Sequence, residues 1–134
     1  MGQSVGTGPT TWLAKKLCQT GQAPKSVVLI TPFTSAVSVA SESAATVTYI
    51  SHAVSEETLD IFDNRYHIQR VTCPVQIIAG TRDQVTPHSQ AEYLTEIAPN
   101  SLPMISLQGS GHNDVWSRDY FASTMNGIRT AVKL

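Results

Sequence analysis

Three apolar runs, rich in β-branched residues, constrain the fold of this 134-residue chain more than any other feature of its sequence. They span 25–30, 75–79 and 104–107. Continuous apolar runs of this kind are typical of strands that are buried on both faces, as in a parallel sheet. Segments with helical spacing alternate with these runs, so we expect βαβ crossovers and one parallel sheet with helices on its faces.

The segments between the runs predict the helices. Apolar spacing favours helices over 10–19, 56–62, 88–98 and 114–132, with 63–70 leading into the second strand. Pro9 suits a first helical turn, and Gly21 ends the first helix. The stretch 36–54 leaves three alternatives open: a helix, a short cap over the site, or a partly mobile segment. We expect a single domain over residues 1–134.

A Gly-x-Ser-x-Gly pattern occupies positions 2–6 and predicts a nucleophilic serine at position 4. In this motif the serine lies on a sharp, strained turn between a strand and a helix, and the glycines Gly2 and Gly6 allow that turn. By itself the pattern is weak, because glycine and serine are both common residues. Its interpretation therefore depends on partners further along the chain.

Asp83 and His112 supply those partners in the expected order of nucleophile, acid and histidine. Asp83 follows the apolar run at 75–79, and His112 follows the run at 104–107. Ligands of open α/β sheets bind at the carboxyl ends of the strands. We therefore expect the side chains of Ser4, Asp83 and His112 to converge at that edge of the sheet.

These three residue types together predict nucleophilic catalysis. A serine hydroxyl is a poor nucleophile at neutral pH and needs a base, the role that we expect of His112. Asp83 would hold the imidazole in the correct tautomer and stabilise it once it is protonated. The backbone N–H of Val5 would be one oxyanion donor. Glycines at 109 and 111 would give the histidine a flexible loop.

Each residue also has a structural interpretation, which stays open at this stage. Ser4 could be a turn serine in a disordered N-terminus, Asp83 could cap a turn, and His112 could be a surface-loop histidine. We interpret Asp114 as the N-cap of the last helix rather than as the acid of the triad. The remaining histidines, which we expect to be surface or packing residues, are His52, His67 and His88.

The segments 2–9, 32–35, 74–83 and 109–114 together resemble the alpha/beta-hydrolase domain-containing seventeen group, which are serine hydrolases that remove palmitate from protein cysteines. Related serine-aminopeptidase-like hydrolases share much of the pattern. The similarity covers nearly the whole chain, and its Gly-His-Asn-Asp stretch is more specific than the serine motif. The resemblance implies an α/β-hydrolase fold with Ser4 as nucleophile, Asp83 as acid and His112 as base.

The chain also departs from that group. Arg82 stands where the group usually has an acidic residue, and 36–61 matches poorly. The resemblance implies that the N-terminal strands are missing, together with a lipidated cysteine cluster and the loop that donates the second oxyanion hydrogen bond. We therefore expect the C-terminal half of an α/β-hydrolase fold, with the strand at 26–30 as an open edge. Such a chain is expected to be poorly folded or aggregation-prone alone, or to be an incomplete product of a longer gene.

The function that we expect is cleavage of acyl esters or thioesters through an acyl-enzyme, with a palmitoyl-protein thioesterase as its sharper form. The partner is then an acyl ester or thioester substrate, including a lipidated protein. Two alternatives stay open: a serine-aminopeptidase-like hydrolase, and a catalytically inactive remnant or interaction module that keeps the motifs by descent.

Charge and cysteine content narrow the remaining classes. The net charge of −1 and the isoelectric point near 6.4 give no indication of nucleic acid or of an anionic membrane surface as a partner. The sequence holds no signal peptide and no apolar stretch long enough to span a bilayer. Cys18 and Cys73 lack metal-binding spacing and are expected to be reduced packing residues, so we expect neither metal nor cofactor. The expected location is the cytoplasm, with peripheral membrane attachment in the full-length protein.

Overall fold

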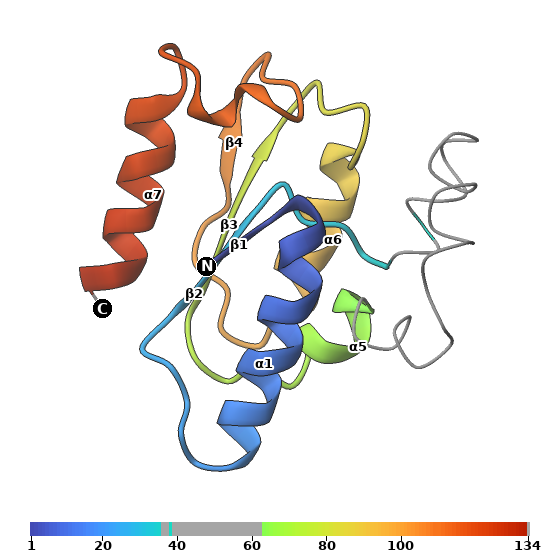
Figure 1. Ribbon diagram of the computed structural model, residues 1–134, viewed down its shortest axis with the longest axis vertical. Helices are drawn as coiled ribbons and strands as arrows, with labels where there is room; N and C mark the ends of the chain where they lie inside the picture. Colours follow the sequence, from blue (N-terminus) through green and yellow to red (C-terminus); the bar gives the residue numbers. More distant parts are fainter. Residues whose placement is uncertain (36–37, 39–62, 134) are drawn as a thin grey trace.

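A parallel sheet of four strands forms the centre of the computed structural model, which describes residues 1–35, 38 and 63–133 (Figure 1). The strands lie in chain order and are β1 (Gly2–Gln3), β2 (Val27–Ile30), β3 (Val75–Gly80) and β4 (Ile105–Leu107). Each neighbouring pair runs parallel. The predicted α/β class is confirmed, and β2, β3 and β4 fall on the three apolar runs.

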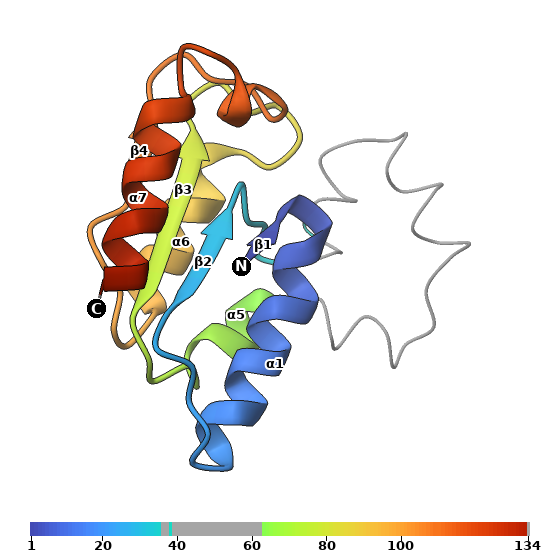
Figure 2. The ribbon, with the colours of Figure 1, turned by 60° about the vertical axis from the view of Figure 1, so that its left-hand side comes forward.

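Helices cover both faces of the sheet (Figure 2). One face carries α1 (Thr7–Gln19), α5 (Asn64–Ile68) and α6 (His88–Ile97), and the other carries α7 (Phe121–Lys133). Successive residues of β3 alternate between the two cores, since Ile77 packs in the first and Ile78 in the second. Both side chains are fully buried, which explains why the strand sequence is continuously apolar.

The first strand corrects the expectation of an uncovered edge at 26–30. Gly2 pairs with Leu29 and Gln3 pairs with Ile30, so β1 covers the carboxyl-terminal part of β2. The reason is geometric. The turn after β1 can lie at the carboxyl edge of the sheet only if the residues before it run beside the neighbouring parallel strand. Although β1 contains only Gly2 and Gln3, it places the turn that follows it at the edge of the sheet.

Helix α1 begins at Thr7, three residues earlier than predicted, and Pro9 falls in its first turn as expected. Its end matches the prediction. Gly21 adopts the left-handed φ of 75° just after the C-cap, and Gln22 donates from its amide to the carbonyl of Leu17 at 2.9 Å. This pair of features is a Schellman ending, which glycine favours.

The single helix predicted over 114–132 is wrong, because the structure divides it. A 3-10 turn η2 (Asp114–Trp116) comes first, Ser117 is extended with ψ of 161°, and α7 then begins at Phe121. Asp114 is therefore not the N-cap of the last helix. Its Oδ2 accepts from the amide of Gly111 at 2.9 Å and tightens the loop that precedes η2.

The short helix α5 precedes β3 and lies within the 63–70 stretch that the sequence assigned only as a lead-in. Asp63 caps it by accepting from the amide of Tyr66 at 3.2 Å. The helix predicted over 56–62 lies outside the described residues, as does 36–54 except for Ser38.

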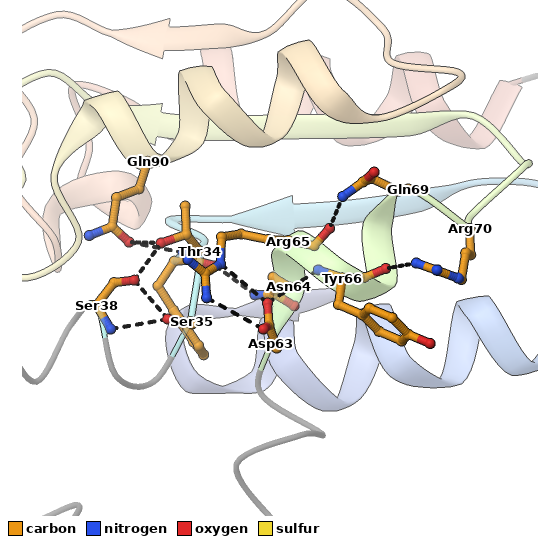
Figure 3. A network of polar contacts seen from close by, with 11 residues as sticks. Thr34, Ser35, Ser38, Asp63, Asn64, Arg65, Tyr66, Gln69, Arg70 and Gln90 are labelled. Atoms are coloured by element: carbon orange, nitrogen blue, oxygen red, sulfur yellow. Dashed lines mark hydrogen bonds and ion pairs between the residues drawn. The ribbon is translucent and has the colours of Figure 1, made fainter.

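A polar network fixes the loop that follows β2 (Figure 3). Thr34 donates from its amide to Gln90 Oε1 at 2.9 Å and accepts at its carbonyl from the amide of Arg65 at 3.1 Å. Asn64, which is fully buried, donates from Nδ2 to the carbonyl of Phe33 at 2.8 Å. The loop is thus held between α5 and α6 at the carboxyl edge of the sheet.

Within residues 1–35 and 63–133, none of the helices combines the length and the apolar character that crossing a bilayer requires.

Candidate active site

Ser4 lies at the turn between β1 and α1, in a backbone conformation that non-glycine residues rarely adopt. Its φ is 49°, and the 3-10 turn η1 (Ser4–Gly6) leads from it into the helix. Thr7 donates from Oγ1 to the carbonyl of Ser4 at 2.7 Å. A strained strand-to-helix turn that projects a serine is the geometry that the Gly-x-Ser-x-Gly pattern predicted.

The two glycines of the motif have different roles. A Cβ at Gly2 would collide with the backbone oxygen of Gly6 and with Oγ1 of Thr10, so the close approach of strand and helix requires glycine there. Gly6 has an ordinary φ of −67°, and none of the described atoms lies within 4 Å of where its Cβ would be. The expectation that both glycines permit the turn is therefore supported for Gly2 alone.

The structure brings Ser4, Asp83 and His112 together. Ser4 Oγ lies 2.8 Å from His112 Nε2, and His112 Nδ1 lies 2.8 Å from Asp83 Oδ2. A carboxylate only accepts, so Nδ1 carries the imidazole proton and Nε2 is left to accept from the serine hydroxyl. Residues 108 positions apart in the chain thus form one continuous hydrogen-bonded line.

Asp83 follows β3 in a fully shielded position, with a side-chain exposure of 0%. Its Oδ1 accepts from the amides of Val85 and Thr86 at 2.9 and 2.8 Å. Burial by itself would raise the pKa of Asp83, but the hydrogen bond from His112 and those two amides outweigh it and hold the pKa below its ordinary value. The carboxylate is therefore charged and fixed where it faces the imidazole.

Specific contacts hold the loop that carries His112. Gly109 adopts a φ of 80° and donates from its amide to Thr81 Oγ1 at 2.8 Å. The backbone of Ser110 packs so closely on Gly80 that a Cβ there would collide with it. Gly109 and Gly80 thus allow a tight turn that docks on the end of β3.

One contact that the sequence did not indicate joins the two ends of the site. Trp116 donates from Nε1 to Gln3 Oε1 at 2.8 Å, so the 3-10 turn after the histidine is tied to the residue before the serine. Thr86 is a second missed residue, with its hydroxyl beside both Asp83 and His112. Neither position carries a residue type whose chemistry marks it from sequence alone.

The other histidines differ from one another. His67 is fully buried and packs edge-on to Tyr66, in agreement with a packing role. His88 is not merely a packing residue, since its Nε2 lies 3.0 Å from Ser106 Oγ and its Nδ1 lies 3.4 Å from Glu92 Oε1. His52 lies outside the described residues.

This second serine–histidine contact lacks two features of the first. Ser106 lies within β4 and pairs with Ala79 in the regular ladder, whereas Ser4 projects from a strained turn. Glu92 is 60% exposed, so its carboxylate is solvated rather than fixed. The contact between Ser106 and His88 is therefore a suitable control when the contact between Ser4 and His112 is tested.

The described part of the chain contains no group of three or more histidine, cysteine, aspartate or glutamate side chains placed to hold a metal ion. Cys18 and Cys73 are both free thiols, and burial, with the neighbouring Cys18, raises the pKa of Cys73 to about 11. A thiol of this kind stays protonated at neutral pH, which agrees with the packing role predicted for it.

Comparisons with known proteins agree with this geometry, although no family model matches the chain. Human alpha/beta hydrolase domain-containing protein 17B is 34% identical over 114 residues, which are 85% of this chain and 35% of that protein. The protein aho-3 of Caenorhabditis elegans is 32% identical over 85% of this chain and 30% of its own length.

Solved structures share the fold at low sequence identity. The acylaminoacyl peptidase of Pyrococcus horikoshii matches 96% of this chain and 22% of its own, with a TM-score of 0.73 and 11% identity. The monoacylglycerol lipase of Paleococcus ferrophilus matches 98% of this chain and 66% of its own, with a TM-score of 0.66 and 16% identity.

The parallel sheet, the strained serine turn and these structural matches define an α/β-hydrolase fold. In sequence the chain is similar to the alpha/beta hydrolase domain-containing proteins 17B and 17C, at 34% identity over 85% of its length. It spans about a third of the length of these curated relatives.

Proposed function

We propose that the chain carries the catalytic triad of a serine hydrolase, with Ser4 as nucleophile, His112 as general base and Asp83 as the orienting acid. The observation that carries this proposal is the unbroken line of 2.8 Å contacts from Ser4 Oγ through the imidazole to Asp83 Oδ2. Nucleophile, base and orienting group within hydrogen-bond reach are the signature of an activated serine.

In the proposed reaction Ser4 Oγ attacks the acyl carbon of a substrate while its proton passes to His112 Nε2. The oxyanion that forms accepts from the backbone N–H of Val5, at the turn that begins the helix. Collapse of this intermediate expels the alcohol or thiol, which takes the proton from Nε2 and leaves an acyl group on Ser4. Water then attacks the acyl-enzyme by the same steps, which releases the carboxylic acid and restores the serine.

The substrate class that we propose is an acyl ester or thioester. The hydrolase fold and the similarity to the 17B and 17C proteins support hydrolysis. The resemblance of the sequence motifs to the domain-containing seventeen group supports the narrower proposal of a fatty-acyl thioester on a protein cysteine. The purified protein can be tested on matched palmitoyl oxygen esters and palmitoyl thioesters. A general acyl hydrolase would cleave both substrates, whereas a thioesterase would prefer the thioester.

We also propose a cytoplasmic location, with peripheral membrane attachment in the full-length protein. Two free cysteines in the described structure are compatible with a reducing compartment. Fractionation of cells that express the full-length protein tests this, and recovery from the secreted fraction would contradict it.

Labelling by a fluorophosphonate probe tests the triad directly. The folded wild-type protein should be labelled, Ser4→Ala should abolish the label, and His112→Ala should reduce its rate by at least about 10³-fold. Ser106→Ala is the matched control, since it removes the other serine that contacts a histidine, and it should leave the label intact. Folded wild-type protein that is not labelled, or a label that survives Ser4→Ala, would contradict the proposal and favour an inactive remnant.

A further inference from the structure

We infer that Thr86 is a positioning residue, whose hydroxyl fixes Oδ2 of Asp83 on the imidazole of His112. This inference rests on the proposed triad and adds a fourth side chain to it. Thr86 lies on the loop between β3 and α6, three residues after the acid, and is 3% exposed.

The hydroxyl of Thr86 lies at the centre of the acid site. Its Oγ1 is 2.9 Å from Asp83 Oδ2, 3.2 Å from His112 Nδ1 and 3.3 Å from the carbonyl oxygen of Thr31. One hydroxyl contributes a single proton. The charged oxygen of Asp83 is both the nearer and the stronger acceptor, so the proton points to the carboxylate rather than to Thr31.

With this bond the carboxylate of Asp83 has four donors. The amides of Val85 and Thr86 occupy Oδ1, and His112 Nδ1 and Thr86 Oγ1 occupy Oδ2. An ionised carboxylate offers about four lone-pair sites, so each is used. The side chain has no exposure through which solvent would replace a lost donor.

The hydroxyl also limits how the imidazole can rotate. A lone pair of Thr86 Oγ1 faces His112 Nδ1. The Nδ1 proton therefore lies between Asp83 Oδ2 and Thr86 Oγ1, which are joined to each other by a hydrogen bond. Tilting the ring away from Asp83 Oδ2 would break both contacts together. The orientation that presents Nε2 to Ser4 is therefore set by Thr86 as well as by the acid.

The backbone and the side chain of Thr86 can be tested separately. Its amide holds Oδ1 and would remain in any substitution except proline, whereas only the hydroxyl holds Oδ2. Thr86→Val keeps the β-branched shape and the amide but removes the hydroxyl. Thr86→Ser keeps the hydroxyl and removes a methyl group, so it is the matched control.

The first readout is the rate of fluorophosphonate labelling, together with kcat and KM on a simple acyl ester. Thr86→Val should label roughly 10- to 100-fold more slowly, because a buried charged acceptor loses a donor. Its kcat should fall while KM changes little, since the hydroxyl acts on the base and not on the substrate. Thr86→Ser should retain a rate within about threefold of wild type.

The second readout does not depend on activity. The low-field proton NMR resonance of His112 Nδ1–H reports its hydrogen bond to Asp83, and it should shift or broaden in Thr86→Val but persist in Thr86→Ser. If Thr86→Val fails to fold, Thr86→Ala should give the same changes. A folded hydroxyl-free variant with an unchanged labelling rate or an unchanged resonance would overturn the inference. Wild-type protein that shows the resonance but no labelling would instead refute the proposed function, leaving the resonance to test the role of Thr86.

Discussion

Ser4 and Thr31 both have positive φ values, of 49° and 47°, and both lie where a parallel strand ends at the same edge of the sheet. For a β-branched residue such as Thr31 this conformation is a true outlier, and each such residue costs about 1–3 kcal/mol. Thr31 donates from its amide to the carbonyl of Ile78 at 2.8 Å and is 1% exposed. The surrounding contacts hold both turns in place, so the strain is concentrated at the candidate active site.

The glycines beside Ser4 give a prediction at the residue scale. Gly2→Ala should lower the free energy of unfolding by about 1–3 kcal/mol, because the added methyl group meets Thr10 and the backbone of Gly6. Gly6→Ala should change it by less than about 1 kcal/mol, since the described atoms leave room and the backbone is helical. Denaturant unfolding of the two variants compares them, and equal losses would contradict this account.

The carboxylate of Asp83 gives a second residue-scale prediction, for stability against pH. Its folded pKa is depressed, so its contribution to stability is present above the unfolded value of about 3.9 and is lost as the pH falls through the folded value. Asp83→Asn should therefore flatten the acid limb of the curve of stability against pH. Asp119→Asn, on an exposed carboxylate, is the control. Thermal melts across this acidic range would refute the prediction if both variants lost stability as steeply as wild type.

Helix α7 shows how one element depends on a single close approach. Gly127 faces the sheet, and a Cβ there would lie 2.6 Å from Ile105 Cδ1 and 2.9 Å from Ile78 Cδ1. The absence of a side chain lets the helix pack closely on β3 and β4, where Ile128 and Ala131 complete the core. Apolar spacing predicted a helix in this region but not this contact, and it did not predict that Phe121 and Val132 would be exposed.

We therefore expect Gly127→Ala to destabilise the protein by about 1–3 kcal/mol, although alanine is the better helix former. Asn126→Ala, on the exposed side of the same helix, should be neutral or slightly stabilising. The measurement is the midpoint of denaturant unfolding for both variants. A stabilised Gly127→Ala would mean that helix propensity outweighs packing at this position.

At the scale of the whole molecule, the sheet has one outer strand that is very short. β1 pairs with Leu29 and Ile30, whereas Val27 and Val28 have no partner on that side within the described residues. An apolar strand with unpaired backbone groups at a sheet edge is a template for association with another chain.

This edge gives a prediction for the 134-residue chain produced by itself. Size-exclusion chromatography with light scattering should show species larger than a monomer, in a proportion that rises with concentration. A compact monomer at all concentrations would contradict the prediction.

The amino-acid sequence by itself determined the alternation of strands and helices and the order of Ser4, Asp83 and His112 along it. Both follow from local information, since apolar runs define strands and a residue after a run lies at the strand's carboxyl end. Asp83 was also recognisable from sequence, because the α/β-hydrolase pattern places an acidic residue between the nucleophilic serine and the histidine.

Only the tertiary structure decided which further residues join the site and where the last helix breaks. Trp116 meets Gln3 across 113 positions, and the hydroxyl of Thr86 meets an imidazole 26 positions away. Such contacts depend on how loops from different strands converge. No local sequence pattern around Trp116 or Thr86 indicates which residue its side chain will contact. The break at the extended Ser117, likewise, is not indicated by helical periodicity.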